Sequence, residues 1–378
     1  MRVAVVGAGS AGTVCGCLLK RSGCNVDLFD RAQRPGGRAS SRLAEGLFSF
    51  DHGAQFMPFT IDDPGLQLIL NTLPGFEGKL LPMSKEFGLV GPKGGFVSAQ
   101  QVGSNVDDVI SITGRDFFGA MKLKGGYMYT GHPTMGSIWS TMCEQSDLGV
   151  KGNSLVSNLS KTEAGWAVHG SNSLLGEGYD AVVLAVHDTV LVSQVLSEMT
   201  HSQDSTKDFV TPLNDLALKI GGIQRSPLYS MMVAYHNKDI EDVSFNSAVV
   251  DGCESIQWIS KNQFQNSEDF SCWTAIATAD FSKTTFENES LGDNPQTKML
   301  ADFEKCLKLK VKPVYCKTQR WSQAVTSNPL ALNEHCLSFE PWRLAVAGDY
   351  IGKNANLESA VLSGIQAADR VLQWEHGV

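Results

Sequence analysis

Apolar positions at the two ends of the chain predict alternating strands and helices. An apolar run over residues 3–6 predicts a strand, and after a glycine-rich turn the pattern predicts a helix over 13–22 and a second strand over 25–29. Near the other end, a predicted strand over 343–347 precedes a Gly-Asp turn and an amphipathic helix over 357–373. Both ends therefore have the pattern of one α/β domain, to which the chain returns.

The middle of the chain has a different pattern. From about 58 to 124, proline and glycine separate short segments without strong helical periodicity, which predicts a mainly β insertion. Further on, a predicted helix over 215–220 is followed by β-rich stretches, which are expected over 228–235, 248–260 and 270–279. This mixture predicts a second domain of sheet and helices.

Composition and charge narrow the class of protein. The 378 residues are 42% apolar and 19% charged, which suits two globular domains and excludes a disordered chain. Acidic residues outnumber basic ones by 40 to 31 and no basic run occurs, so nucleic acid is not an expected partner. Nine scattered cysteines favour free thiols in a reducing compartment over a disulfide framework or a metal site. We expect a cytoplasmic protein without a membrane span.

Three glycines directly after the first strand form a dinucleotide-binding fingerprint. Gly7 would permit the tight turn, Gly9 would let a diphosphate approach the backbone, and Gly12 would let the helix pack closely on the strand. Asp30 ends the second strand, where a carboxylate commonly binds ribose hydroxyls. The fingerprint alone leaves FAD and NAD(P) open. The candidate residues of this region are Gly7, Gly9, Ser10, Ala11, Gly12, Asp30 and Arg31.

A second glycine pair favours FAD. Gly36 and Gly37 would bring another stretch of backbone beside the cofactor, and Arg38 offers a bidentate guanidinium to a diphosphate. This arrangement resembles the double-glycine motif of the flavin-containing amine oxidase superfamily. The following run over 51–56, with small residues that would admit a flat ring and with Gln55 near its reactive face, resembles the renalase-like branch of that superfamily.

The resemblance extends to the C-terminal part of the chain and implies bound FAD. It implies that Asp349 binds the ribityl chain, that the helix opening at Asn356 and Leu357 points at the flavin, and that main-chain groups at Val156 reach the adenine. The chain departs from renalase-like sequences where glycines are replaced by Asn354, Ala355 and Ser359. The further candidates are Gly37, Arg38, Gly53, Ala54, Gln55, Phe56, Val156, Gly348, Asp349, Asn356 and Leu357.

A missing lysine narrows the expected chemistry. Many amine oxidases of the superfamily present a lysine to the flavin from a strand that here spans 228–235, and this strand has none. Renalase-like enzymes also lack it, which implies oxidation of isomeric reduced nicotinamide dinucleotides, with hydride passing to flavin N5 and then to O2 to give peroxide. No catalytic side chain is assigned. The candidate residues of the substrate cavity are Gln55, Trp258, Lys261, Arg320 and Trp321.

The expected fold is α/β. A discontinuous Rossmann-type FAD-binding domain is predicted over 1–58, 126–190 and 335–378, and an inserted substrate-binding domain of mixed β-sheet plus helices over 59–125 and 191–334. A flavin amine oxidase, a desaturase-like enzyme and a catalytically inactive flavin-binding redox sensor or binding module stay open as alternatives. An NAD(P)-dependent reductase would need a second G-x-G-x-x-G unit, which the sequence lacks.

Overall fold

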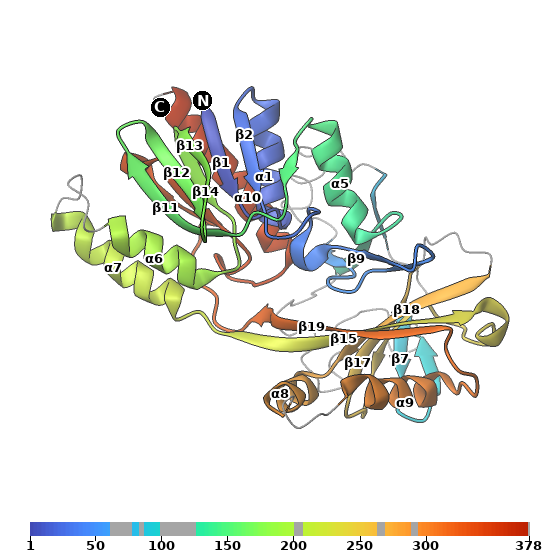
Figure 1. The fold of residues 1–378 in the computed structure, drawn as a ribbon. Helices are drawn as coiled ribbons and strands as arrows, with labels where there is room; N and C mark the ends of the chain where they lie inside the picture. Colours follow the sequence, from blue (N-terminus) through green and yellow to red (C-terminus); the bar gives the residue numbers. More distant parts are fainter. Residues whose placement is uncertain are drawn as a thin grey trace.

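The computed structural model describes residues 1–60, 78–82, 87–98, 126–199, 207–262, 269–288 and 294–376. Within this part of the chain, strands from both ends form one six-stranded sheet, which we call the first sheet (Figure 1). Its order is β10 (Val150–Lys151), β2 (Asn25–Phe29), β1 (Arg2–Val6), β14 (Ala181–Leu184), β21 (Leu344–Ala347) and β20 (Cys336–Phe339). All of these strands pair in parallel except β20, which runs antiparallel to β21. The strands predicted at both ends of the chain are confirmed.

Both faces of the first sheet are covered, which explains its continuous apolar strands. Val3 and Val5 of β1 lie in a cluster with helices α1 (Ser10–Arg21), α5 (Met135–Gln145) and α10 (Leu357–His376). Ala4 and Val6 point to the other face because successive side chains of a strand alternate. The elements on that face are β11 (Val156–Thr162), β12 (Gly165–Gly170), β13 (Leu174–Tyr179), α6 (Thr189–Met199) and α7 (Lys207–Gly221).

The predicted division of the chain at residue 190 places α7 and nearly all of α6 in the substrate-binding domain, but in the structure both helices pack on the first sheet. Their buried residues, among them Leu191, Val192 and Leu213, pack with Ala4 and Val6 of the first sheet. The apolar face of each helix is buried against this sheet, so the helices belong structurally with it.

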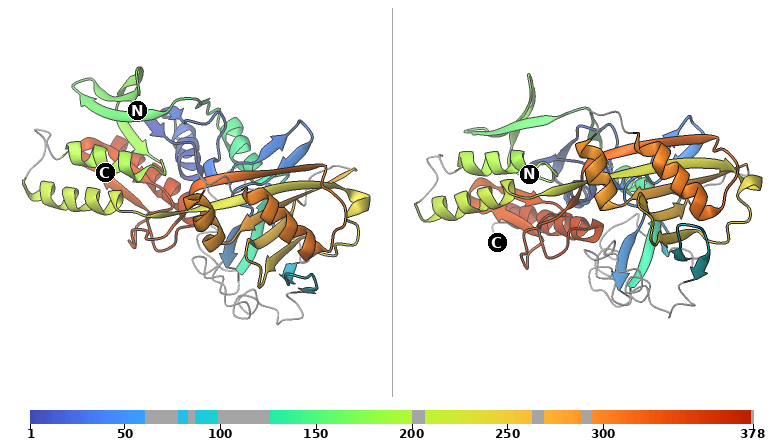
Figure 2. Two further views of the ribbon diagram at one scale, coloured as in Figure 1. Left: turned by 60° about the horizontal axis from the view of Figure 1, so that its bottom comes forward. Right: turned by 90° about the horizontal axis from the view of Figure 1, so that it is seen from below.

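A seven-stranded sheet, the second sheet, forms the other large layer. Its order is β19 (Tyr315–Thr326), β15 (Arg225–His236), β18 (Phe270–Ala277), β17 (Ile256–Lys261), β16 (Ser247–Val250), β7 (Phe87–Val90) and β8 (Phe96–Ser98). Two helices, α8 (Ala279–Glu287) and α9 (Pro295–Leu307), cover one face, as Figure 2 shows in orange. The predicted β-rich stretches are confirmed, although 248–260 contains two strands rather than one.

A hairpin of two short strands lies against the other face of the second sheet, and a separate three-stranded sheet packs with α5 and α10. The hairpin of β3 (Arg42–Ala44) and β4 (Phe48–Phe50) shares a hydrophobic cluster with Met232 and Ala234 of β15. A three-stranded sheet consists of β5 (Met57–Thr60), β9 (Gly126–Gly131) and β6 (Leu80–Pro82). Within the described ranges, short 3-10 helices span Gly37–Ala39, Asn237–Asp239 and Glu340–Trp342. No helix in these ranges is both long and apolar enough to cross a bilayer.

Strands β15 and β19 connect the two layers (Figure 1). They pair antiparallel from Arg225 opposite Thr326 to Ala234 opposite Tyr315. At the first of these ends, Arg225 donates to the backbone carbonyl of His187, which follows β14 of the first sheet. The other end carries the hydrophobic clusters of the second sheet. One strand pair therefore fixes how the second sheet meets the first.

The close packing of α1 on α10 gives a test of the fold. A Cβ at Gly364 of α10 would overlap the carbonyl oxygen of Ala11, whereas a Cβ at Gly149 would meet nothing within 4 Å. We expect Gly364→Ala to lower the free energy of unfolding by about 1–3 kcal/mol, because overpacking displaces the helix. Gly149→Ala should change it by less than about 1 kcal/mol. Urea denaturation measures both; equal stability of the two variants would contradict this packing.

Candidate functional site

The first glycine turn has two tight positions and one open one. Gly7 adopts φ +103°, and a Cβ there would lie 2.5 Å from the carbonyl oxygen of Ala185. A Cβ at Gly12 would overlap the carbonyl oxygen of Gly7. A Cβ at Gly9, by contrast, would meet nothing within 4 Å. The outer glycines are therefore required by packing, while the middle one leaves space beside the backbone at the start of α1, where a helix N-terminus favours an anion.

The second glycine pair lies directly beside this turn. Gly36 donates its N–H to the carbonyl oxygen of Ala8 at 2.8 Å. Gly36 and Gly37 both have positive φ, and a Cβ at Gly37 would lie 3.1 Å from the Cα of Gly9. Two backbone segments with glycines thus border the same open position, as the sequence predicts.

Asp30, directly after β2, holds the glycine turn in place through hydrogen bonds of its carboxylate. Its Oδ2 accepts the N–H of Ala8 and its Oδ1 accepts the N–H of Ala32, each at 2.6 Å. Its backbone oxygen accepts the N–H of Ser154 at 2.8 Å, which brings the chain that leads into Val156 to the same place. The residues predicted to contact the ribose and the adenine, Asp30 and Val156, therefore lie on neighbouring segments. Arg31 is exposed beside them.

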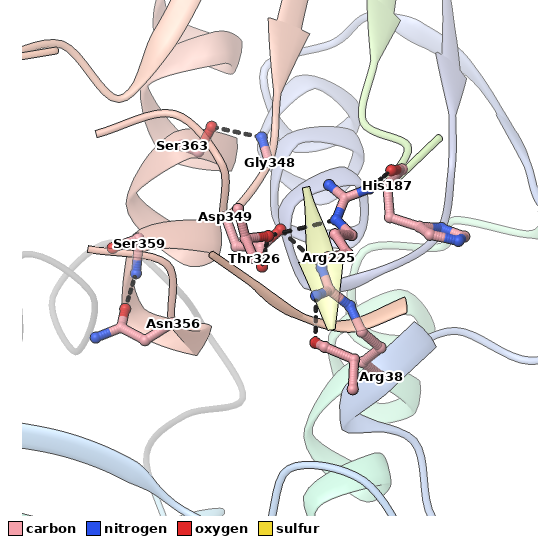
Figure 3. Close-up of polar contacts among 10 residues, drawn as sticks. Arg38, His187, Arg225, Thr326, Gly348, Asp349, Asn356, Ser359 and Ser363 are labelled. Carbon is pink, nitrogen blue, oxygen red and sulfur yellow. Dashed lines mark hydrogen bonds and ion pairs between the residues drawn. The ribbon is translucent and has the colours of Figure 1, made fainter. Parts of the chain in front are cut away.

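Arg38 and Asp349 form an ion pair next to the glycine segments (Figure 3). Arg38 Nη2 lies 2.7 Å from Asp349 Oδ1, and Nη1 donates to the carbonyl oxygen of Ala324 at 2.9 Å. Burial would raise the pKa of Asp349, but the charges of Arg38 and Arg225 lower it below its usual value, so this carboxylate is ionised at neutral pH. Gly348 donates its N–H to Ser363 Oγ at 2.8 Å, which ties the turn to α10.

Residues 51–56 lie between Arg38 and the second sheet. Ala54 donates its N–H to the carbonyl oxygen of Arg38 at 2.9 Å, and a Cβ at Gly53 would overlap that oxygen. The structure therefore places the small residues of this run against the Arg38 backbone. Glycine at 53 is needed for this contact whether or not a ring binds there.

The amide of Gln55 is held by two donors from the second sheet. Its Oε1 accepts Trp258 Nε1 at 2.7 Å and Ser260 Oγ at 2.5 Å, and its Nε2 has no hydrogen-bond partner among the described residues. The ring of Phe56 lies 5.2 Å from that of Trp258. Three predicted site residues, Gln55, Phe56 and Trp258, are thus in mutual contact.

His52 links the same run to β15 and β19. Its carbonyl oxygen accepts Ser230 Oγ at 2.6 Å and Trp321 Nε1 at 2.9 Å. Burial, reinforced by the charge of Arg42, lowers the pKa of the imidazole to about 4, so His52 is neutral at pH 7. Trp321 also approaches Gly53, so this predicted residue lies on the side of the second sheet that faces the glycine segments.

Lys261 and Arg320 do not join this group, contrary to the predicted cavity. Ser260 and Trp321 point toward residues 52–55, and their strand neighbours Lys261 and Arg320 point to the opposite face because side chains alternate. Arg320 lies over the ring of Phe286 in α8, which covers that face. Alternation along each strand already separates Arg320 from Trp321 and Lys261 from Trp258, but the sequence does not show which of them faces residues 52–55.

Two helices begin near these segments. Asn356 Oδ1 accepts the N–H of Ser359 at 2.8 Å, so the side chain caps α10, which starts at Leu357. Met135, the first residue of α5, donates its N–H to Asp51 Oδ1 at 3.0 Å. Three further residues take part in the site: Asp51, Arg225 and Thr326. The sequence motifs do not include Arg225 and Thr326, and they assign no role to Asp51.

Comparisons with known proteins agree with this architecture. Residues 5–73 match a family model described as an NAD(P)-binding Rossmann-like domain. No curated protein matches the chain by sequence. Among solved structures, an oxidoreductase from Methanosarcina mazei is similar with a TM-score of 0.67 and 13% identity, over 98% of this chain and 100% of that one.

Two further structures cover nearly the whole chain. A candidate protoporphyrinogen oxidase from Exiguobacterium sp. 255-15 has a TM-score of 0.64 and 12% identity, over 97% of this chain and 98% of that one. A cofactor-binding redesign of putrescine oxidase has a TM-score of 0.64 and 13% identity, over 98% and 99%. At such identities the likeness establishes the fold: the predicted α/β class, with a Rossmann-like domain and a mixed second sheet, is confirmed.

Buried Asp51 gives a test that is independent of any ligand. Burial raises its pKa to about 7, against which hydrogen bonds from Ser41 and the Met135 N–H act only in part. The folded state therefore holds a proton that the unfolded state releases, so the contribution of Asp51 to stability falls as pH rises from about 4 to about 7 and is then constant. Asp51→Asn should reduce the loss between pH 5 and pH 8 by on the order of 1–3 kcal/mol. Urea denaturation at both values measures it.

The matched control is Asp147→Asn in an exposed turn, which should keep the wild-type pH dependence. An Asp51→Asn variant whose stability falls with pH as steeply as that of the wild type would show that Asp51 does not titrate in this window.

Proposed function

We propose that this chain is an FAD-dependent oxidoreductase. The observation that carries the proposal is the contact of the two glycine segments around the open position at Gly9, with Arg38 and Asp349 beside them. A single fingerprint would serve NAD(P) equally well, but a second glycine segment at Gly36 and Gly37 adds donors and space along a longer dinucleotide. The similarity over nearly the full length to structures named as oxidases adds support.

The residues present fit a non-covalent dinucleotide. Asp30 would accept ribose hydroxyls on its remaining lone pairs, the N–H groups at the start of α1 and Arg38 would hold the diphosphate, and Asp349 would meet the ribityl chain. Gly53, Ala54 and Gln55 would border the ring system. Bound FAD would supply the two-electron acceptor.

The side chains of β15 near residues 52–55 favour a donor that needs no base from this strand. On the face of β15 that contacts His52 and the β3–β4 hairpin, the residues are Ser230, Met232 and Ala234, none of which titrates near neutral pH. His52 is neutral. A dihydropyridine can lose hydride without losing a proton, because its ring becomes an aromatic cation. We therefore propose isomeric forms of NAD(P)H as substrates, with electrons passing on to O2 to give H2O2.

A flavin amine oxidase is the second candidate. One structure similar to this chain over nearly its full length is a redesigned putrescine oxidase, and an amine oxidase would share the motifs that favour FAD. Because Lys261 and Arg320 point to the other face, the support for a nicotinamide donor rests on Trp258, Trp321 and the absence of a lysine from residues 228–235.

Anaerobic stopped-flow reduction separates the candidates. We expect 2- or 6-dihydro isomers of NAD(P)H to bleach the flavin absorbance of the holoprotein at least about tenfold faster than ordinary NADPH, and simple amines to leave it unchanged. Rapid bleaching by an amine, with none by the isomers, would select the amine oxidase. Failure of every donor would leave a flavin-binding redox sensor or binding module.

Substitution of Asp30 tests the cofactor register. Loss of charge-assisted hydrogen bonds worth roughly 1.5–3 kcal/mol each should weaken FAD binding of Asp30→Ala at least tenfold. Titration of the apoprotein with FAD, followed by flavin fluorescence, measures the change. Asp180→Ala is the control, because Asp180 accepts the N–H of Arg2 at 2.7 Å at the opposite end of β1. Equal affinity of both variants would move the ribose contact away from Asp30.

A further inference from the structure

Arg225 lies at the end of β15 that meets the first sheet (Figure 3). Its Nη1 donates to the carbonyl oxygen of His187, and its Nε donates to Thr326 Oγ1 at 3.3 Å. The guanidinium carbon lies 5.4 Å from the centre of the ring of Tyr350, the residue that directly follows Asp349 in the chain. A residue from the second sheet is thereby fixed among the cofactor-binding segments, although it belongs to no motif.

One nitrogen of this guanidinium is buried without a hydrogen bond. Nη2 of Arg225 is inaccessible to solvent and has no hydrogen-bond partner among the described residues. A guanidinium carries five N–H donors and always keeps its charge, so buried donors without acceptors are costly. The position therefore favours an additional acceptor, and an anionic one in particular.

The protein carboxylates nearby are already engaged. Asp349 Oδ1 is paired with Arg38, and its Oδ2 accepts Thr326 Oγ1 at 3.5 Å. Asp188 Oδ1 accepts the N–H groups of Val190 and Leu191 at the start of α6. Asp30 holds backbone N–H groups with both oxygens.

Cations, in contrast, gather around His187. Burial lowers the pKa of this histidine to about 4, and three guanidinium groups add to the effect. They belong to Arg31, Arg38 and Arg225. His187 follows Ala185, whose carbonyl oxygen borders Gly7 of the glycine turn. Three cationic groups therefore act on His187, two residues after the Ala185 that borders the turn at which a dinucleotide diphosphate would lie.

We propose that Arg225 is a second arginine for the diphosphate of the dinucleotide, contributed by the second sheet. This inference rests on the proposed function and adds a binding residue to it. Arg38 alone is largely occupied by Asp349 and by the carbonyl oxygen of Ala324. A diphosphate carries two negative charges at neutral pH, and Nη2 of Arg225 would supply a donor in addition to those of Arg38.

The proposal links cofactor binding to the arrangement of the two sheets. Arg225 and Thr326 are paired residues of β15 and β19, and the same strands continue into the second sheet. A diphosphate held by Arg225 would bridge the first sheet to this strand pair. The cofactor would then stabilise the position of Trp321 and Ser230, which lie further along the same two strands.

The test compares two flavins on the apoprotein. FAD carries the diphosphate, whereas riboflavin has the same ring and ribityl chain without phosphate. We expect Arg225→Gln to raise the Kd for FAD at least tenfold and to leave the Kd for riboflavin within about twofold of wild type. Arg225→Lys, which keeps the charge but not the fork, should give an intermediate FAD affinity. Quenching of flavin fluorescence measures each titration.

The control is Arg370→Gln, at a half-buried position of α10 where Nη1 of Arg370 donates to Gln373 Oε1. It should bind both flavins as the wild type does. An unchanged FAD affinity in Arg225→Gln, or an equal loss for FAD and riboflavin, would overturn the proposal while leaving the proposed function intact. Should Arg225→Gln not fold, FAD binding by Arg225→Lys with wild-type affinity would also overturn it. Failure of the wild-type apoprotein to bind FAD would reject the proposed function itself.

Discussion

The ion pair of Arg38 and Asp349 joins segments 311 residues apart in the chain, and the site is built around it. Arg38 follows the double glycine, and its carbonyl oxygen accepts the N–H of Ala54, so the position of residues 51–56 depends on the backbone that carries this arginine. Asp349 follows β21, which is embedded in the first sheet. A buried carboxylate without its cation would be strongly unfavourable, so the pair holds both ends of the chain at one place.

Strands β15 and β19 extend this arrangement to the second sheet. Ala324 accepts a hydrogen bond from Arg38, and Thr326 lies between Arg225 and Asp349 (Figure 3). Farther along, Ser230 and Trp321 both donate to the carbonyl oxygen of His52. The strand pair thus contacts the motif segments at two levels. Ala324, which accepts from Arg38, and Trp321, which donates to His52, lie on the same strand, β19. A ligand bound by Arg38 would therefore be connected through β19 to residues 52–55.

The sequence is informative wherever the constraint is local. Gly12 is required by a contact within the turn, with the carbonyl oxygen of Gly7, and Gly7 has a positive φ of +103°; the spacing of the two glycines alone predicts both. The sequence also predicts that Gly36 and Gly37 lie near the first glycine turn, because both segments are expected to border one cofactor. In the structure, Gly36 donates its N–H to Ala8 of that turn. Helix α9 also carries a local signal that the sequence analysis left unused: Asn294 caps it, Pro295 begins it, and its buried positions recur at helical spacing.

Contacts that depend on strand register could not be predicted from one sequence. Alternation alone separates Lys261 and Arg320 from Trp258 and Trp321, but only the packing of the second sheet shows that the tryptophans face residues 52–55 and that Arg320 faces α8. Arg225 has no motif, and only the pairing of β15 with β19 brings it to Asp349. Helices α6 and α7 similarly show their apolar faces in the sequence but not the sheet that these faces cover.

We propose that the two glycine segments and the Arg38–Asp349 pair form a cradle for FAD, and identification of the flavin in the purified protein tests this proposal. The purified protein should be yellow, and its acid-soluble fraction should contain FAD at about one equivalent per chain. A colourless protein that takes up no FAD on reconstitution would contradict it. A flavin that stays in the acid precipitate would contradict non-covalent binding of the cofactor.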